Sequence, residues 1–143
     1  MYLVDMDFSE KRLTTENIHV TVGISIFYLT ILRLIYKTFN PTPNLNNSIF
    51  PGQKIIAKLN HVFLYISILM ITISGALKKL YNGEELNMFF FNLEIQDNFE
   101  LAEIFYEIHI LGNYTLIALI SLHIFAVLIH KILFKENLLK RIL

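Results

Sequence analysis

The chain has 143 residues, of which 55% are hydrophobic, and its mean hydropathy is +0.53. This composition favours an integral membrane protein over a soluble domain. The formal net charge is zero, which argues against a protein that holds nucleic acid on a basic face. Cysteine is absent, which excludes disulfides, iron–sulfur clusters and covalent cofactor attachment through a Cys-x-x-Cys-His motif.

Three apolar stretches follow a polar, acidic N-terminal segment. Residues 1–17 lack the apolar core and the small-residue cleavage site of a signal peptide, so none is predicted. A helix needs about 20 residues to cross a membrane, and residues 18–36, 55–77 and 104–134 are long enough. Residues 40–44 and 51–52 contain prolines and a glycine that turn the chain between the first two. The sequence predicts one all-α membrane domain over residues 1–143, a bundle of three transmembrane helices.

The charges outside these stretches predict the orientation. Residues 78–103 form an acidic connection, in which Met88–Phe91 is expected to lie at the membrane interface. Basic residues flank the first loop and fill the tail, and cytoplasmic segments are rich in such residues. We therefore expect a bacterial inner-membrane protein with a cytoplasmic C-terminus and an outer N-terminus. The basic residues concerned are Lys37, Lys54, Lys58, Lys131, Lys135, Lys140 and Arg141, against Glu136 alone in the tail.

The histidines are the most informative residues, because a polar side chain inside a membrane is costly unless it is paired or bound. His19 opens the first expected span, and the other four lie within spans: His61, His109, His123 and His130. At about 100° per residue, His109 and His123 leave the same face of one helix, and the rise between them is about 21 Å. This spacing suits two haem ligands, one near the outer surface and one beyond the midplane.

A haem iron held by two histidines needs a second ligand from another helix at the same depth. His19 opens the first helix at the outer level of His109, so these two are expected to bind one haem. Gly23 lies one turn beyond His19, where a missing side chain would let a porphyrin approach, although ordinary helix packing is an alternative. For His123 no equally good partner is visible.

His61 lies about 9 Å from the cytoplasmic end of its span, against about 6 Å for His130 and about 16 Å for His123. We therefore expect His61 and His130 to flank a pocket for quinone or proton transfer, with snorkelling to the interface as the alternative. Asn60 and Tyr65 are weaker candidates for the same pocket.

Two charged residues complete the candidate set. Arg33 lies deep in the first span, where it would either pair with a haem propionate or snorkel to the surface. Glu107 is expected at the outer interface with its carboxylate in water.

The stretch from His19 through Val20-Thr21-Val22-Gly23, with Arg33-Leu34 and Asn40-Pro41-Thr42-Pro43, resembles the second helix of the bacterial cytochrome b561 family. The resemblance continues through the second span and to His109, His123 and His130. The best-known activity of that family is superoxide oxidase. Its members are four-helix bundles with two b-type haems, which relay electrons between superoxide or another outer donor and ubiquinone in the respiratory chain.

The resemblance implies that His19 and His109 are the axial ligands of the outer haem. It implies that His123 is one ligand of the inner haem, whose other ligand comes from the family's first helix. That helix is not visible here, and Tyr2–Val4 resembles its last turn. We expect one haem b, or two if an upstream start or a partner supplies the helix; a decayed gene is the third explanation.

Three functions remain open at this point. The leading hypothesis is a membrane cytochrome that carries electrons, either as a superoxide:ubiquinone oxidoreductase or as an electron carrier only. Its haem would supply the redox chemistry, with ubiquinone or a redox subunit as partner. One alternative is the cytochrome b subunit of a larger dehydrogenase or hydrogenase. The other is a haem-free membrane remnant or assembly protein.

Overall fold

Three long helices make up most of the structure. The computed structural model describes residues 10–40 and 52–133. Helix α1 runs over Glu10–Phe39, α2 over Gln53–Tyr81 and α3 over Phe99–Leu133. All three are long and apolar enough to cross a membrane. The predicted fold class, an all-α membrane bundle with three spanning helices, is confirmed.

The helices are longer than the apolar stretches that predicted them. Helix α1 starts at Glu10 and α3 at Phe99, while α2 continues to Tyr81. The difference arises because hydropathy marks only the part of a helix that lies in hydrocarbon, whereas backbone hydrogen bonding continues into polar turns. Within α1, the hydroxyl groups of Thr21, Ser25 and Thr30 donate to carbonyls four residues earlier, which satisfies them in apolar surroundings.

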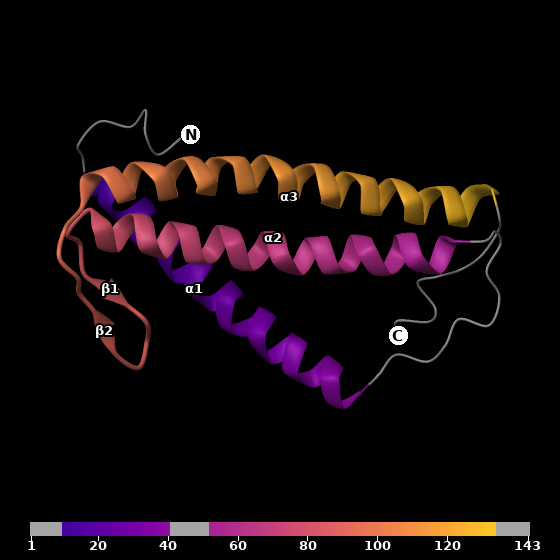
Figure 1. Ribbon diagram of the computed structural model, residues 1–143, viewed down its shortest axis with the longest axis horizontal. Coiled ribbons are helices and arrows are strands. Elements are labelled where there is room, and N and C mark those ends of the chain that lie inside the picture. Colours follow the sequence, from indigo (N-terminus) through magenta and orange to yellow (C-terminus); the bar gives the residue numbers. More distant parts are fainter. Residues whose placement is uncertain (1–9, 41–51, 134–143) are drawn as a thin grey trace.

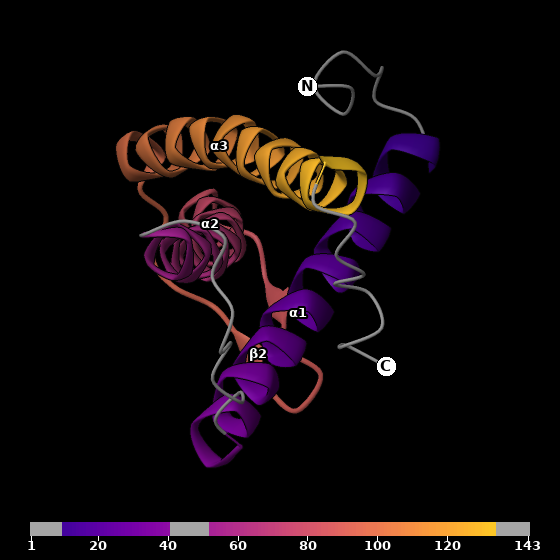
Figure 2. The same ribbon diagram turned by 90° about the vertical axis from the view of Figure 1, so that its right-hand side faces the viewer.

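Helices α2 and α3 pair antiparallel along their length, and α1 leans across one flank of this pair (Figures 1 and 2). Small residues allow the close pairing. A Cβ atom added to Gly112 on α3 would lie 2.7 Å from Cγ1 of Ile71 on α2. Helices in membranes commonly approach through such small residues, since lipid removes the hydrophobic drive between them.

A short hairpin lies within the expected acidic connection. Strand β1 (Leu86–Asn87) pairs antiparallel with β2 (Asn92–Leu93). In the turn, Phe89 has a φ of 69°, and its N–H donates to Oδ1 of Asn87 at 2.8 Å. The hydroxyl of Tyr28 on α1 donates to the Met88 carbonyl at 3.1 Å, which attaches the hairpin to α1.

The buried core lies between α1, α2 and the hairpin. Ile24, Leu80 and Leu86 form it, and Leu86 is only 1% exposed. Most other large apolar side chains face outward, as lipid-exposed residues of a membrane protein do. Phe90, in the cluster predicted for the interface, is 83% exposed, and its contact with the interface remains a prediction.

Candidate haem site

His19 and His109 meet between α1 and α3. Their ring centroids are 6.0 Å apart, and the ring planes make an angle of 76°. The structure therefore brings together the two rings for which the sequence predicted equal depth. Imidazole nitrogens bind metal ions at about 2 Å, so two rings on opposite sides of one ion have their centres roughly 6 Å apart. The spacing of this pair fits two axial ligands of one iron.

The hydrogen bond of His109 determines which of its ring nitrogens keeps a lone pair for a metal. Nδ1 of His109 lies 2.9 Å from the carbonyl oxygen of Ile71 on α2. A carbonyl oxygen can only accept, so Nδ1 carries the proton and donates. In the neutral ring, Nε2 then keeps its lone pair for a metal, which is the usual arrangement of a metal-binding histidine and its backbone partner.

Gly75 makes room for this ring. A Cβ atom at Gly75 would lie 3.0 Å from both Cε1 and Nδ1 of His109. Any side chain there would push the ring away from the Ile71 carbonyl. Sequence reasoning did not identify Gly75 or Ile71, although the Ser-Gly-Ala run at residues 74–76 is a sign of close helix packing.

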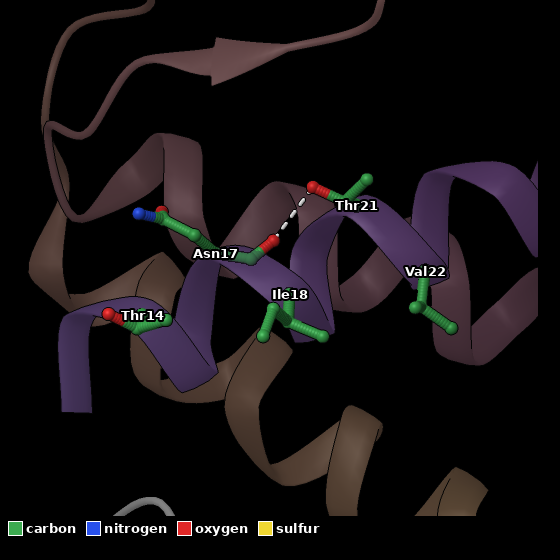
Figure 3. Close-up of a pocket in the computed structure, with 5 residues that line it drawn as sticks. All are labelled: Thr14, Asn17, Ile18, Thr21 and Val22. Atoms are coloured by element: carbon green, nitrogen blue, oxygen red, sulfur yellow. Dashed lines mark hydrogen bonds between the residues drawn. The ribbon is translucent and has the colours of Figure 1, made fainter. Parts of the chain in front are cut away.

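Gly23 lies one turn beyond His19, and a Cβ atom built on it would meet no heavy atom of the described residues within 4 Å. The backbone of α1 is thus uncovered by protein on that side. Nearby, a shallow hollow of about 330 Å³ lies over the first turns of α1 (Figure 3). Its lining residues are Thr14, Asn17, Ile18, Thr21 and Val22, and His19 is not among them.

A second hollow, of about 320 Å³, lies where α1 meets the hairpin, and its lining includes Asn17, Lys79 and Asn87. The ammonium group of Lys79 forms an ion pair with Glu16 at 3.7 Å and also pairs with Glu84. Two carboxylates therefore neutralise this cation at the hairpin end of the bundle.

A second pair of histidines lies at the opposite end of the α2–α3 pair. The rings of His61 and His123 have centroids 5.3 Å apart and planes 63° apart. Beside them, Nδ2 of Asn60 lies 3.1 Å from Nδ1 of His123. His123 is thus far from the His19–His109 pair, as two separate sites require.

The sequence matched His61 with His130 in depth, and the structure corrects this by placing His61 beside His123. Depth was measured from the ends of the apolar stretches, but α3 extends past the start of α2 (Figure 1). A position on α3 therefore lies closer to the level of the start of α2 than its distance from the end of α3 suggests, which brings His123 level with His61. His130 lies near the end of α3, and its side chain is outside the described residues, as are Tyr2–Val4, Pro41–Pro43 and the basic tail.

Arg33 contacts α2 one turn away from this second pair. Its Nε donates to the hydroxyl of Tyr65 at 3.0 Å, and Nζ of Lys37 lies 5.1 Å from the centre of the same ring. Both cations therefore interact with Tyr65, which lies on the same helix as His61. Glu107 is exposed on α3, and its place at the outer interface with the carboxylate in water stays a prediction.

The set of protein ligands in the described residues suits a metal held in a macrocycle better than a bare metal ion. Among residues 10–40 and 52–133, no three His, Asp or Glu side chains gather closely enough to hold a metal ion. Structural zinc sites need four protein ligands and catalytic ones three, whereas haem brings its own ring nitrogens and takes only axial ligands from the protein. Two imidazoles on neighbouring helices suit the second case.

Comparison with known proteins agrees with this chemistry. The family model described as prokaryotic cytochrome b561 matches residues 2–143. Cytochrome b561 homolog 2 of Escherichia coli (strain K12) is 26% identical over 129 residues, covering 88% of this chain and 69% of the relative. Cytochrome b561 homolog 1 of the same organism is 28% identical over 137 residues, covering 94% and 78%. The chain belongs to the prokaryotic cytochrome b561 family, whose members are multi-pass membrane proteins that bind haem b and carry electrons.

Proposed function

We propose that His19 and His109 are the axial ligands of a haem b near the outer surface, and that this haem accepts electrons from superoxide or another donor there. The observation that carries the proposal is the paired geometry of the two rings, 6.0 Å apart, with Nδ1 of His109 held by the Ile71 carbonyl. The haem supplies the one-electron chemistry. The protein holds the iron and surrounds it with helices of low polarity.

His123 is proposed as one axial ligand of a second haem, towards the cytoplasm. Gly23 and Arg33 belong to the haem surroundings in this proposal: the first as an uncovered backbone that a porphyrin can approach, the second as a cation for a propionate. The Arg33–Tyr65 hydrogen bond supports the second role, because it holds the guanidinium near the helix that carries His61.

His61 and His130 are proposed to bind ubiquinone or to deliver protons to it. His61 lies beside His123, and Asn60, Tyr65 and Arg33 supply further hydrogen-bonding groups in the same half of the bundle. The acceptor would thus take electrons close to the second haem. Protons for the quinol would come from the cytoplasmic surface, to which the basic ends of the helices are proposed to point.

The orientation rests on the charges at the helix ends. The end of α1, the start of α2 and the end of α3 lie at the same end of the molecule, away from the hairpin (Figure 1). Lys37 and Lys58 lie at that end, whereas Glu84, Glu85 and Glu94 lie in or beside the hairpin. An excess of lysine and arginine marks cytoplasmic segments, which supports a cytoplasmic C-terminus.

The direct test uses the full chain, purified with its native haem and placed in lipid vesicles. We expect a superoxide source to reduce the b-type haem, and added ubiquinone to reoxidise it. His61→Gln should slow reoxidation by quinone and leave reduction by the donor unchanged. Reoxidation at the same rate in His61→Gln would remove His61 from the quinone site. A purified chain without a reduced-minus-oxidised b-type band would contradict the haem proposal itself.

A further inference from the structure

Helix α2 supplies a hydrogen-bond partner to Nδ1 of two histidines on α3, His109 and His123. For His109 the partner is the carbonyl oxygen of Ile71, at 2.9 Å. For His123 it is the side-chain amide of Asn60, at 3.1 Å. Both contacts are half-buried. The two histidines thus have the same kind of outer partner from the same helix, but the partners differ chemically.

The carbonyl of Ile71 is part of the helix backbone, so it accepts and cannot turn. It therefore holds the proton of His109 on Nδ1 and leaves Nε2 free to bind a metal. An asparagine amide offers both a donor and an acceptor, and rotation of the amide by half a turn exchanges them. With Nδ2 of Asn60 facing His123, as in the structure, Nδ1 accepts, and the neutral ring carries its proton on Nε2.

We infer that Asn60 is a positioning residue that controls whether His123 can bind a metal through Nε2. This inference rests on the proposed role of His123 as a haem ligand. With Nδ2 of Asn60 on Nδ1, Nε2 of His123 is protonated and has no lone pair for iron. When the amide turns and its Oδ1 accepts from Nδ1, Nε2 becomes free. Ligation by His123 is therefore coupled to the rotation of Asn60, whereas ligation by His109 is fixed in advance.

The surroundings of His123 place Asn60 in this role. The ring of His61 also lies beside that of His123, in an edge-to-face contact with centroids 5.3 Å apart. Within the described part of the chain, the ring of His123 forms its hydrogen bond with Asn60. Asn60 also immediately precedes His61 on α2, so one turn of helix presents both groups to His123.

Two substitutions of similar size separate the possibilities. Asn60→Asp offers only acceptors, so it locks the proton on Nδ1 and leaves Nε2 free. Asn60→Leu offers neither group and leaves the tautomer undetermined. Asn113→Asp is a matched control, because Asn113 also lies on the α2–α3 pair but donates to the main-chain carbonyl of His109, in its own helix, at 2.8 Å. It adds the same carboxylate at a side chain whose hydrogen bond goes to the main chain instead of to an imidazole.

The test records nitrogen-15 spectra of labelled histidines in the full chain in detergent micelles, with any haem reduced and diamagnetic. His123→Gln identifies the signals of His123. If no iron occupies His123, we expect the proton on Nε2 in the parent chain and on Nδ1 in Asn60→Asp. If iron is bound, Nδ1–H should exchange with solvent at least about tenfold faster in Asn60→Leu, because the hydrogen bond is lost.

A second measurement follows the haem. Outer partners of metal-binding histidines change metal affinity by about 10- to 100-fold. A tenfold preference of Asn60→Asp for the oxidised haem would lower its midpoint potential by about 59 mV, a conversion that holds for one electron. His109 signals should be unaltered in both variants, and Asn113→Asp should leave His123 unchanged.

The inference is overturned if the proton position and exchange rate of His123 are the same in the parent chain and in both Asn60 variants. It is also overturned if Asn113→Asp shifts the His123 tautomer as much as Asn60→Asp does. The proposed function fails separately: if His123→Gln retains every haem of the parent chain, His123 is not a ligand. The tautomer measurement tests Asn60 whether or not that haem is present.

Discussion

Nδ1 of His109 on α3 lies 2.9 Å from the carbonyl oxygen of Ile71 on α2, so the helix that pairs with α3 orients the ring that faces His19 on α1. Three helices therefore cooperate in one site. Helices α1 and α3 each present an imidazole, and α2 fixes the tautomer of one of them. Because a helix carbonyl is rigid, the lone pair of Nε2 is available before any cofactor arrives.

Replacing either proposed ligand of the outer haem should remove that haem. We expect His19→Leu and His109→Leu to lose one low-spin b-type component each, because one imidazole cannot complete a six-coordinate iron. His61→Leu is the matched control, since it removes a histidine from α2 and should retain this component. The measurement is haem per chain with the reduced-minus-oxidised spectrum. Unaltered haem content in both ligand variants would refute the assignment.

Gly75→Ala should displace His109. The added Cβ would lie 3.0 Å from Nδ1 and Cε1, so the ring must move and its bond to Ile71 must lengthen. We expect haem affinity to fall by about 10- to 100-fold, as for loss of an outer partner. Gly112→Ala serves as a comparison, because its Cβ would meet Ile71 and Met70 instead of the imidazole. Haem titration should show the larger loss of affinity for Gly75→Ala at comparable helix content.

Gly23→Ala tests whether a porphyrin covers the open side of α1. The new Cβ would meet no atom of the described residues within 4 Å, so protein packing alone predicts a gain of up to about 1 kcal/mol from helix propensity. If a porphyrin packs against this backbone, the added methyl group would instead destabilise the haem-bound protein and lower haem retention. We expect this destabilisation, measured as faster haem loss to an acceptor protein. Slower or equal haem loss would show that the porphyrin lies elsewhere.

Tyr28→Phe should loosen the hairpin without affecting either histidine pair. The variant removes the hydrogen bond to the Met88 carbonyl and keeps the ring that contacts Phe89 and Phe90. We expect a cost of about 1 kcal/mol and faster amide exchange at residues 86–93. Thr72→Val is a suitable control, since it removes a hydroxyl whose hydrogen bonds to described residues stay within α2. Equal exchange rates in parent and Tyr28→Phe would contradict this attachment.

The sequence predicted those features of the site that a single helix determines, such as its span and the depth of its histidines. Each spanning helix was recognisable from its apolar length, although polar first turns such as Glu10–Asn17 on α1 lay outside the prediction. The depth of His19 and His109 followed from the rise per residue, and their contact agrees with it. The hairpin at residues 86–93 was missed, because strands this short have no periodic pattern.

What the sequence determined by itself is which residues lie in the membrane and at what height along their own helix, because hydropathy and helical rise are local properties. Only the tertiary structure decided which helices lie side by side and how far one extends past the other. That offset places His61 beside His123, and Asn60 within hydrogen-bonding distance of the same ring. It arises from side-chain packing at positions such as Gly75 and Gly112, where fractions of an ångström between distant residues decide how two helices meet.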